Sequence, residues 1–255
     1  MDTSVRRTFL IATILATATG AAGLAPTLAR AQTLDEIVAR HVAARGGVER
    51  WQGLRSLRMT GRAVAGPGRE VLVSREVVRP GRIRTEFTSQ GVTDVYVFDG
   101  ERGWYVSPST GVFDQQPMSP ENLRQAAEQA DIEGPLVSWR SKGHQVELIG
   151  KETVDGREAY RLRTTLAGGT TRDDLIDAQS FLTIRTDTTR RVRGQTLQLE
   201  TTFGDYRESG GLWFPHSIVS TAKGRPQSLR IVVDTVEVNP GIDEQRFKPS
   251  ALPPQ

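Results

Sequence analysis

The chain has no cysteine, which excludes a disulfide framework, a thiol nucleophile and a lipid anchor on an N-terminal cysteine. An apolar core alone must therefore hold the fold together. Histidine is scarce as well, since only His41, His144 and His216 occur, in segments far apart in the sequence. None of them has a second histidine three or four residues away, as a helical zinc site requires. No metal site and no cofactor are expected.

The signatures of common enzymes are missing too. The sequence has no glycine-rich phosphate loop ending in Gly-Lys-Ser/Thr and no serine in a nucleophile elbow. The best remaining candidate for acid–base or cation chemistry is the group Asp173, Asp174 and Asp177. In a strand, residues 173 and 174 point to opposite faces, so a solvated strand edge is the simpler interpretation. We expect no enzyme, and a cation-dependent hydrolase is kept as an alternative hypothesis.

Long apolar runs are absent beyond the first 31 residues, and nothing later approaches the run of about 18 that a membrane span needs. The start itself is typical of a secretory signal peptide. Arg6-Arg7 precedes an apolar stretch over residues 9–24, and Ala29-Arg30-Ala31 forms a small-residue cleavage site before Gln32. We predict removal of residues 1–31 and a periplasmic mature chain. The arginine pair fits twin-arginine export, and an ordinary signal peptide is the alternative.

The charge pattern argues against a nucleic-acid partner. The predicted signal holds Arg6, Arg7, Arg30 and Asp2, so it accounts for +2 of the formal charge of +3. Arginines in the remainder are interleaved with acidic residues along predicted strands, whereas nucleic-acid binding proteins usually show a basic stripe.

The predicted elements are few helices and many strands. Thr33 and Glu36 form a capping box for a first helix that ends at Gly46-Gly47. Between residues 57 and 238, apolar residues mostly alternate with polar ones and turn residues separate the segments, which predicts about ten or eleven antiparallel strands. The pattern breaks at residues 117–143, where Ser119-Pro120-Glu121 starts a helix and residues 135–139 suggest a second short helical turn. The fold class is mainly β, as a barrel, half-barrel or sandwich.

Among the residues not yet assigned a role, apolar and aromatic side chains are the most prominent. Their simplest role is the core of a large sheet. A curved sheet with helices in its concavity would use the same residues to line an apolar cavity.

Several motifs, in this order and spacing, resemble the outer-membrane lipoprotein-sorting (LolA-like) family over nearly the whole mature chain. They are Arg79-Pro80-Gly81-Arg82-Ile83-Arg84, Phe98-Asp99-Gly100, Gly103-Trp104-Tyr105, Val154-Asp155-Gly156, Phe203-Gly204-Asp205-Tyr206-Arg207 and Gly211-Leu212-Trp213-Phe214-Pro215.

The resemblance implies an antiparallel unclosed β-barrel with helices over its concave face, enclosing an apolar cavity for acyl chains. It would form one domain over residues 32–248, followed by a loose tail at 249–255. The family resemblance gives Arg79 the role of closing the lid by hydrogen bonding. The candidate cavity and lid residues are Arg79, Phe87, Phe98, Trp104, Leu123, Leu136, Trp139, Phe181 and Phe203.

The implied function is a monomeric periplasmic carrier or chaperone. Each acyl methylene removed from water is worth about 0.8 kcal/mol, so such a carrier needs an apolar cleft and no catalyst. Its partners would be lipoprotein acyl chains or a lipid, passed from an inner-membrane donor to an outer-membrane acceptor. Arg62, Arg75 and Arg84 are expected at the cavity mouth, facing anionic lipid heads. The alternative within the same fold is a sensor that binds lipidated or misfolded envelope proteins.

Overall fold

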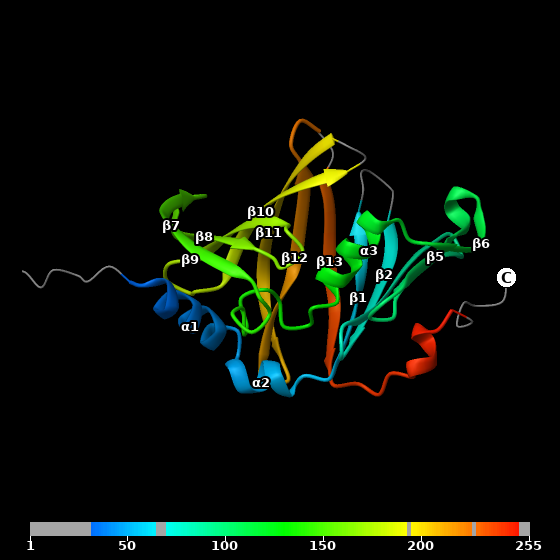
Figure 1. The fold of residues 1–255 in the computed structure, drawn as a ribbon, viewed down its shortest axis with the longest axis horizontal. Coiled ribbons are helices and arrows are strands. Elements are labelled where there is room, and N and C mark those ends of the chain that lie inside the picture. Colours follow the sequence, from blue (N-terminus) through cyan, green and yellow to red (C-terminus); the bar gives the residue numbers. More distant parts are fainter. Residues whose placement is uncertain (1–31, 65–69, 193–194, 226–227, 250–255) are drawn as a thin grey trace, which may run out of the picture. The chain divides into compact units, whose positions relative to one another are not determined.

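The computed structural model describes residues 32–64, 70–192, 195–225 and 228–249. These residues form an antiparallel sheet of 13 strands in the order β6-β5-β4-β3-β2-β1-β13-β12-β11-β10-β9-β8-β7 (Figure 1). The strands are β1 Ser56–Val64, β2 Glu70–Val78, β3 Arg82–Ser89, β4 Val92–Phe98, β5 Gly103–Ser107, β6 Val112–Pro117, β7 Gln145–Val154, β8 Arg157–Thr165, β9 Thr171–Asp177, β10 Thr183–Val192, β11 Gln195–Ser209, β12 Leu212–Ala222 and β13 Ser228–Val238. The sheet does not close, because β6 and β7 form its two edges. The predicted mainly-β, antiparallel and unclosed fold is confirmed.

The chain builds the sheet as two meanders that meet in its middle. From the middle of the sheet, β1 to β6 follow one another toward one edge. Strand β7 forms the other edge, and β8 to β13 follow one another back to the middle, where β13 pairs with β1. Tight turns join several neighbours. Gln90-Gly91, Asp155-Gly156 and Gly210-Gly211 each link two strands with both residues at positive φ, as a type I′ hairpin turn requires. These hairpins place consecutive strands side by side.

Three helices and two short 3₁₀ turns accompany the sheet: α1 Leu34–Ala44, α2 Val48–Gly53, α3 Pro120–Gln129, η1 Pro108–Thr110 and η2 Glu244–Phe247. The predicted capping box of α1 is present, since Thr33 Oγ1 accepts from the Glu36 amide and Glu36 accepts from the Thr33 amide. Ser119 caps α3 as expected. Helix α3 and the segment that follows it lie within the curve of the sheet, whereas α1 and α2 lie along one rim (Figure 1).

The structure differs from the prediction in four places. Strand β6 was not expected, because five of its six residues are exposed and an edge strand open on both faces shows no alternation. Helix α2 was missed as well. Residues 135–139 form turns instead of a helix. The alternation of residues 181–186 predicts a strand from Phe181, but β10 begins at Thr183, since Phe181 adopts a left-handed φ of 58° that interrupts an extended strand.

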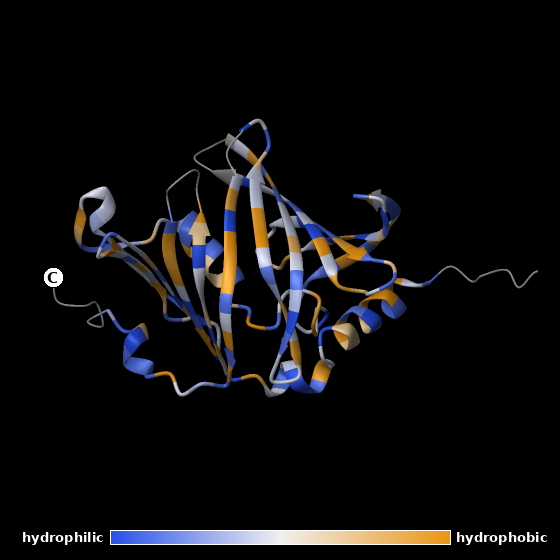
Figure 2. Cartoon of the chain, turned by 180° about the vertical axis from the view of Figure 1, so that it is seen from behind, coloured by the Kyte–Doolittle hydropathy of each residue, from blue (hydrophilic) through white to orange (hydrophobic). Residues whose placement is uncertain are grey.

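The apolar residues form one main core and smaller clusters. The main core joins α1, α2 and residues 130–137 to the sheet, with Trp51 fully buried and its ring 5.5 Å edge-on from Phe214. Colouring by hydropathy shows the alternation of apolar and polar residues along the strands (Figure 2). A second cluster packs η2 onto the sheet through Phe247 and Trp104.

Among the residues that the structure describes, no helix has the length and apolar character needed to cross a bilayer. The predicted signal peptide at 1–31, and residues 250–255 of the predicted tail, lie outside the described ranges.

Candidate functional site

An apolar cleft of about 370 Å³ lies between α3 and the sheet. Strands β2, β3, β4 and β13 supply its floor through side chains such as Val73, Phe87, Phe98 and Ile231. The cleft is apolar because every second residue of a strand faces the same side. The Phe87 ring meets Tyr96 edge-on, with centroids 6.0 Å apart. Such a surface can hold hydrocarbon, and its polar groups come from Arg75, Thr85, Tyr96, Asn122, Gln125 and Gln129.

Helix α3 covers this cleft without being firmly packed. None of its residues is buried, and Leu123 and Ala126 make its contacts with the main core. Gly103 on β5 lets the start of this segment approach closely, since a Cβ there would lie 2.6 Å from Met118 Sδ and 3.0 Å from Leu123 Cδ1. A cover held by so few apolar contacts can separate from the sheet at low cost.

A second cleft of about 690 Å³, with more charged residues in its lining, adjoins the first, and Gln129 lines both. It lies between the end of α3, the segment after it, the turn at Arg79 and strand β10. Charges of both signs line it, including Arg124, Arg190, Glu128 and Asp131. The two clefts are therefore neighbours, and the second has more charged residues in its lining.

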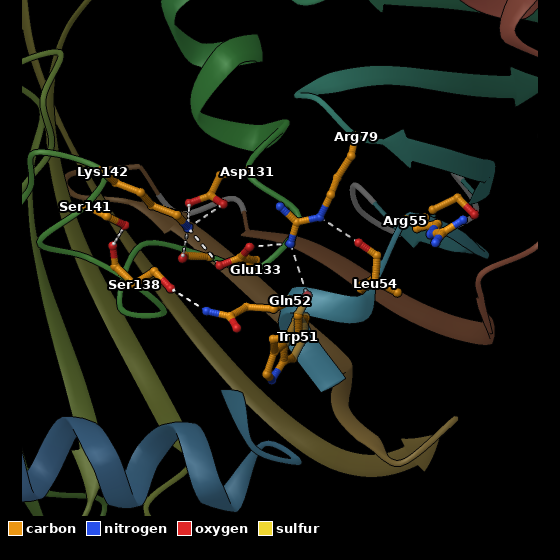
Figure 3. Close-up of polar contacts among 12 residues, drawn as sticks. Trp51, Gln52, Leu54, Arg55, Arg79, Asp131, Glu133, Ser138, Ser141 and Lys142 are labelled. Atoms are coloured by element: carbon orange, nitrogen blue, oxygen red, sulfur yellow. Dashed lines mark hydrogen bonds and ion pairs between the residues drawn. The ribbon is translucent and has the colours of Figure 1, made fainter. Parts of the chain in front are cut away.

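Arg79 ties the segment after α3 to the connection between α2 and β1 (Figure 3). Its Nε donates to the Leu54 carbonyl at 2.6 Å, and its Nη2 donates to the Trp51 carbonyl at 3.0 Å. The same Nη2 donates to the carboxylate of Glu133, a residue that is 5% exposed. This arrangement fits the predicted lid-closing role of Arg79, and that role stays a prediction.

Further contacts strengthen this connection (Figure 3). Lys142 Nζ donates to both Asp131 oxygens at 2.7 and 2.8 Å and lies 3.5 Å from Glu133 Oε2. From the other side, Arg45 donates to the Glu133 carbonyl at 3.2 Å while its guanidinium stacks 4.1 Å from the Trp51 ring centroid. We call Arg79, Asp131, Glu133 and Lys142 the latch.

Arg75 is the charged residue in the apolar cleft. Its Nη2 donates to Gln129 Oε1 at 3.3 Å, and no carboxylate among the described residues pairs with it. Loss of hydration lowers the pKa of Arg75. Its position is visible in the sequence, because it stands in phase with the apolar residues Val73 and Val77 of the same strand.

The other two arginines expected at the cavity mouth line neither cleft. Arg62 pairs with Glu70 and Asp234, and Arg84 pairs with Glu86. Both alternate with the apolar residues of their strands, so they point to the opposite face of the sheet. Their placement corrects the expectation.

The predicted site residues are only partly brought together. Phe87 and Phe98 line the apolar cleft, Leu123 belongs to its cover and Arg79 borders the second cleft. The others lie elsewhere. Leu136 and Phe181 are buried in the main core with Trp139 packed against it, Trp104 belongs to the η2 cluster, and Phe203 is half-buried opposite Ile218 on β12. Glu133 was missed because nothing local marks a pair with Arg79 formed across 54 residues of sequence. Lys142 was missed because its partners Asp131 and Glu133 lie in an irregular segment with no regular spacing to indicate the contact.

The three aspartates of the hydrolase hypothesis are buried on β9, an inner strand, so the interpretation as a solvated strand edge is wrong. They have separate structural partners. Burial tends to raise the pKa of Asp173, but hydrogen bonds from Arg163 and Arg161 hold it below its ordinary value. Asp174 accepts from Arg172 and from Thr186 Oγ1. Asp177 accepts from two amides of its own turn. No group of three histidine, aspartate or glutamate side chains suited to a metal ion occurs in the described part of the chain.

His41 is a structural residue of α1. It is 2% exposed, and its Nδ1 lies 2.8 Å from the Phe181 carbonyl. Burial, helped by the nearby charge of Arg45, lowers its pKa to about 4. The imidazole is therefore neutral near pH 7 and anchors α1 to the turn between β9 and β10.

The fold is shared with solved structures of low sequence identity. A DUF1329 family protein from Desulfovibrio piger aligns with a TM-score of 0.61 at 12% identity, covering 88% of this chain and 100% of that one. A domain from Vibrio parahaemolyticus, named for outer membrane lipoprotein sorting, aligns with a TM-score of 0.57 at 14% identity, covering 83% of this chain and 94% of that one. A LolA superfamily protein from Nitrosomonas europaea aligns with a TM-score of 0.56 at 14% identity, covering 86% of this chain and 98% of that one.

No protein-family model and no curated protein sequence matches the chain. The resemblance drawn from the sequence motifs is confirmed for the fold, which is LolA-like.

Proposed function

We propose that the protein is a periplasmic carrier that shelters acyl chains of a lipid or lipoprotein beneath α3 and releases them to a membrane or partner. The observation that carries the proposal is the apolar cleft of about 370 Å³ covered by a helix with no buried residue. The periplasmic location in this proposal is inferred from the predicted signal peptide. The fold shared with a domain named for lipoprotein sorting supports the same function.

The energetics favour passive transfer. Covering a chain of ten methylenes is worth on the order of 8 kcal/mol, at about 0.8 kcal/mol for each methylene removed from water. This energy holds the cargo in the cleft while it is surrounded by water. Release then requires an acceptor that buries the chain at least as well, and no nucleotide is needed to drive that step.

The latch gives the carrier a means of opening. Helix α3 leads directly into the segment that Arg79 holds through Glu133, so breaking this pair loosens the cover of both clefts, which the contacts of Gln129 with Arg75 and of Glu133 with Arg45 still hold. The remaining contacts of α3 with the core, through Leu123 and Ala126, are apolar and can be replaced by contacts with cargo.

Adjacent residues of β2 provide a matched test. Val73 lines the cleft, whereas Leu72 points to the other face and is 57% exposed. Native mass spectrometry of protein purified from the periplasm should show bound lipid in the wild type and in Leu72→Glu. Val73→Glu should lose it, because its carboxylate, even when it pairs with Arg75, puts a polar and hydrated group where hydrocarbon would lie.

The same variants are to be compared for displacement of a fluorescent acyl probe. A wild-type protein without lipid and without probe binding would contradict the carrier function. Equal probe binding by folded Val73→Glu and wild type would remove the cleft beneath α3 from the proposal.

A further inference from the structure

Arg75 differs from most arginines of the sheet, since among the described strand arginines only Arg190 and Arg230 likewise have no carboxylate partner. Strand arginines of the described chain are generally neutralised by carboxylates within the protein: Arg58, Arg62, Arg82, Arg84, Arg157, Arg161, Arg163, Arg172, Arg185 and Arg207 all have such partners. Arg75 instead faces a cleft whose lining contains no acidic residue. Its positive charge is therefore not compensated by the protein.

The geometry leaves most of this guanidinium available. An arginine has five N–H donors and stays cationic at neutral pH, and Arg75 uses one of them on the uncharged Gln129. The surroundings are apolar, including Val73, Phe87 and Phe98, and this environment strengthens attraction to an anion that enters the cleft. Guanidinium groups bind carboxylates and phosphates through paired hydrogen bonds.

We propose that Arg75 and Gln129 form a head-group site, so that the cargo is an amphiphile with a carboxylate or phosphate next to its acyl chain. This inference rests on the proposed carrier function and specifies its ligand. The chain would lie against the aromatic floor of the cleft, and the anionic head would displace or share the Gln129 contact. The cleft volume of about 370 Å³ is near the lower end of the range of roughly 300–1,000 Å³ for ligand sites, which suits a small amphiphile.

The test compares palmitate with its uncharged methyl ester, using competition against a fluorescent acyl probe at mildly alkaline pH. Wild-type protein should bind palmitate at least about tenfold more tightly, a difference of about 1.4 kcal/mol. Arg75→Gln should abolish this preference, because it weakens palmitate binding far more than ester binding, and Arg75→Lys should retain part of it. Hexadecyl phosphate, which has a single chain of the same length as palmitate, distinguishes a phosphate from a carboxylate as the preferred head in the same assay. A preference for either anion over the ester supports the site.

Arg62→Gln is the matched control, because Arg62 lies on the opposite face of the same sheet with acidic partners. It should keep the wild-type preference. Arg75→Met replaces Arg75→Gln if circular dichroism shows that the glutamine variant does not fold.

Three outcomes would overturn the assignment in distinguishable ways. Equal binding of both anions and the ester by wild type would refute the head-group site and leave the carrier function standing. Failure of all probes to bind would refute the carrier function as well. Loss of the preference in Arg190→Gln but not in Arg75→Gln would place the head group in the second cleft, where Arg190 Nε is buried without a hydrogen-bond partner.

Discussion

The latch predicts a specific cost for removing Arg79. In Arg79→Met, the carbonyls of Trp51 and Leu54 lose a charged donor and the buried carboxylate of Glu133 loses its closest cation. Hydrogen bonds to charged groups contribute about 1.5–3 kcal/mol each, and breaking a fully buried ion pair costs about 3–5 kcal/mol.

Two features reduce that cost. The Arg79 side chain is 37% exposed, so water screens its interactions, and Lys142 remains 3.5 Å from Glu133. We therefore expect the free energy of unfolding to fall by about 2 kcal/mol in Arg79→Met, measured by urea denaturation. Adding Glu133→Gln should recover about 1 kcal/mol, because the double variant no longer buries an unpaired charge.

Hydrogen exchange provides the local readout. Amides in residues 131–142 should exchange faster in Arg79→Met, since this segment loses its tie to the α2–β1 connection. Arg102→Met is the control, because Arg102 is 73% exposed and lies 3.7 Å from Asp99, so its loss should cost less than about 0.5 kcal/mol. An Arg79→Met protein with wild-type stability and wild-type exchange in this segment would refute the latch.

Two further predictions concern stability. The pKa of His41 is about 4 in the folded protein, against 6.5 for an ordinary histidine, so on acidification the unfolded chain takes up a proton first. The free energy of unfolding should therefore fall as the pH drops from 6.5 to 4, by up to about 1.4 kcal/mol per pH unit. His41→Gln should remove this part of the slope in urea titrations, and parallel curves for the two proteins would contradict the assignment. Gly61→Ala should destabilise the protein by about 1–3 kcal/mol, because its Cβ would lie 2.2 Å from the Val232 carbonyl oxygen. Gly168→Ala, whose Cβ would meet nothing within 4 Å, should melt close to wild type, and equal loss in both would remove the steric explanation.

The features predicted correctly from sequence are those that depend on neighbouring residues. The Thr33 and Glu36 capping box and the Ser119 cap of α3 need only a few residues in a row. The alternation along the strands likewise identified an antiparallel sheet and placed Arg75 among apolar residues. Strand β6 was not predicted because both of its faces are exposed, so its sequence shows no alternation of apolar and polar residues.

The tertiary structure decided what these local patterns leave open. Alternation says which residues share a face, but only the curvature of the sheet and the position of α3 determine which face becomes the cleft. Only the tertiary structure therefore distinguishes Arg75, which enters that cleft, from Arg62 and Arg84, which pair with carboxylates on the other face of the sheet. The pairing of Arg79 with Glu133 joins residues 54 apart and depends on the whole fold. Sequence determined the elements, and long-range packing determined where the charges and the cavity lie.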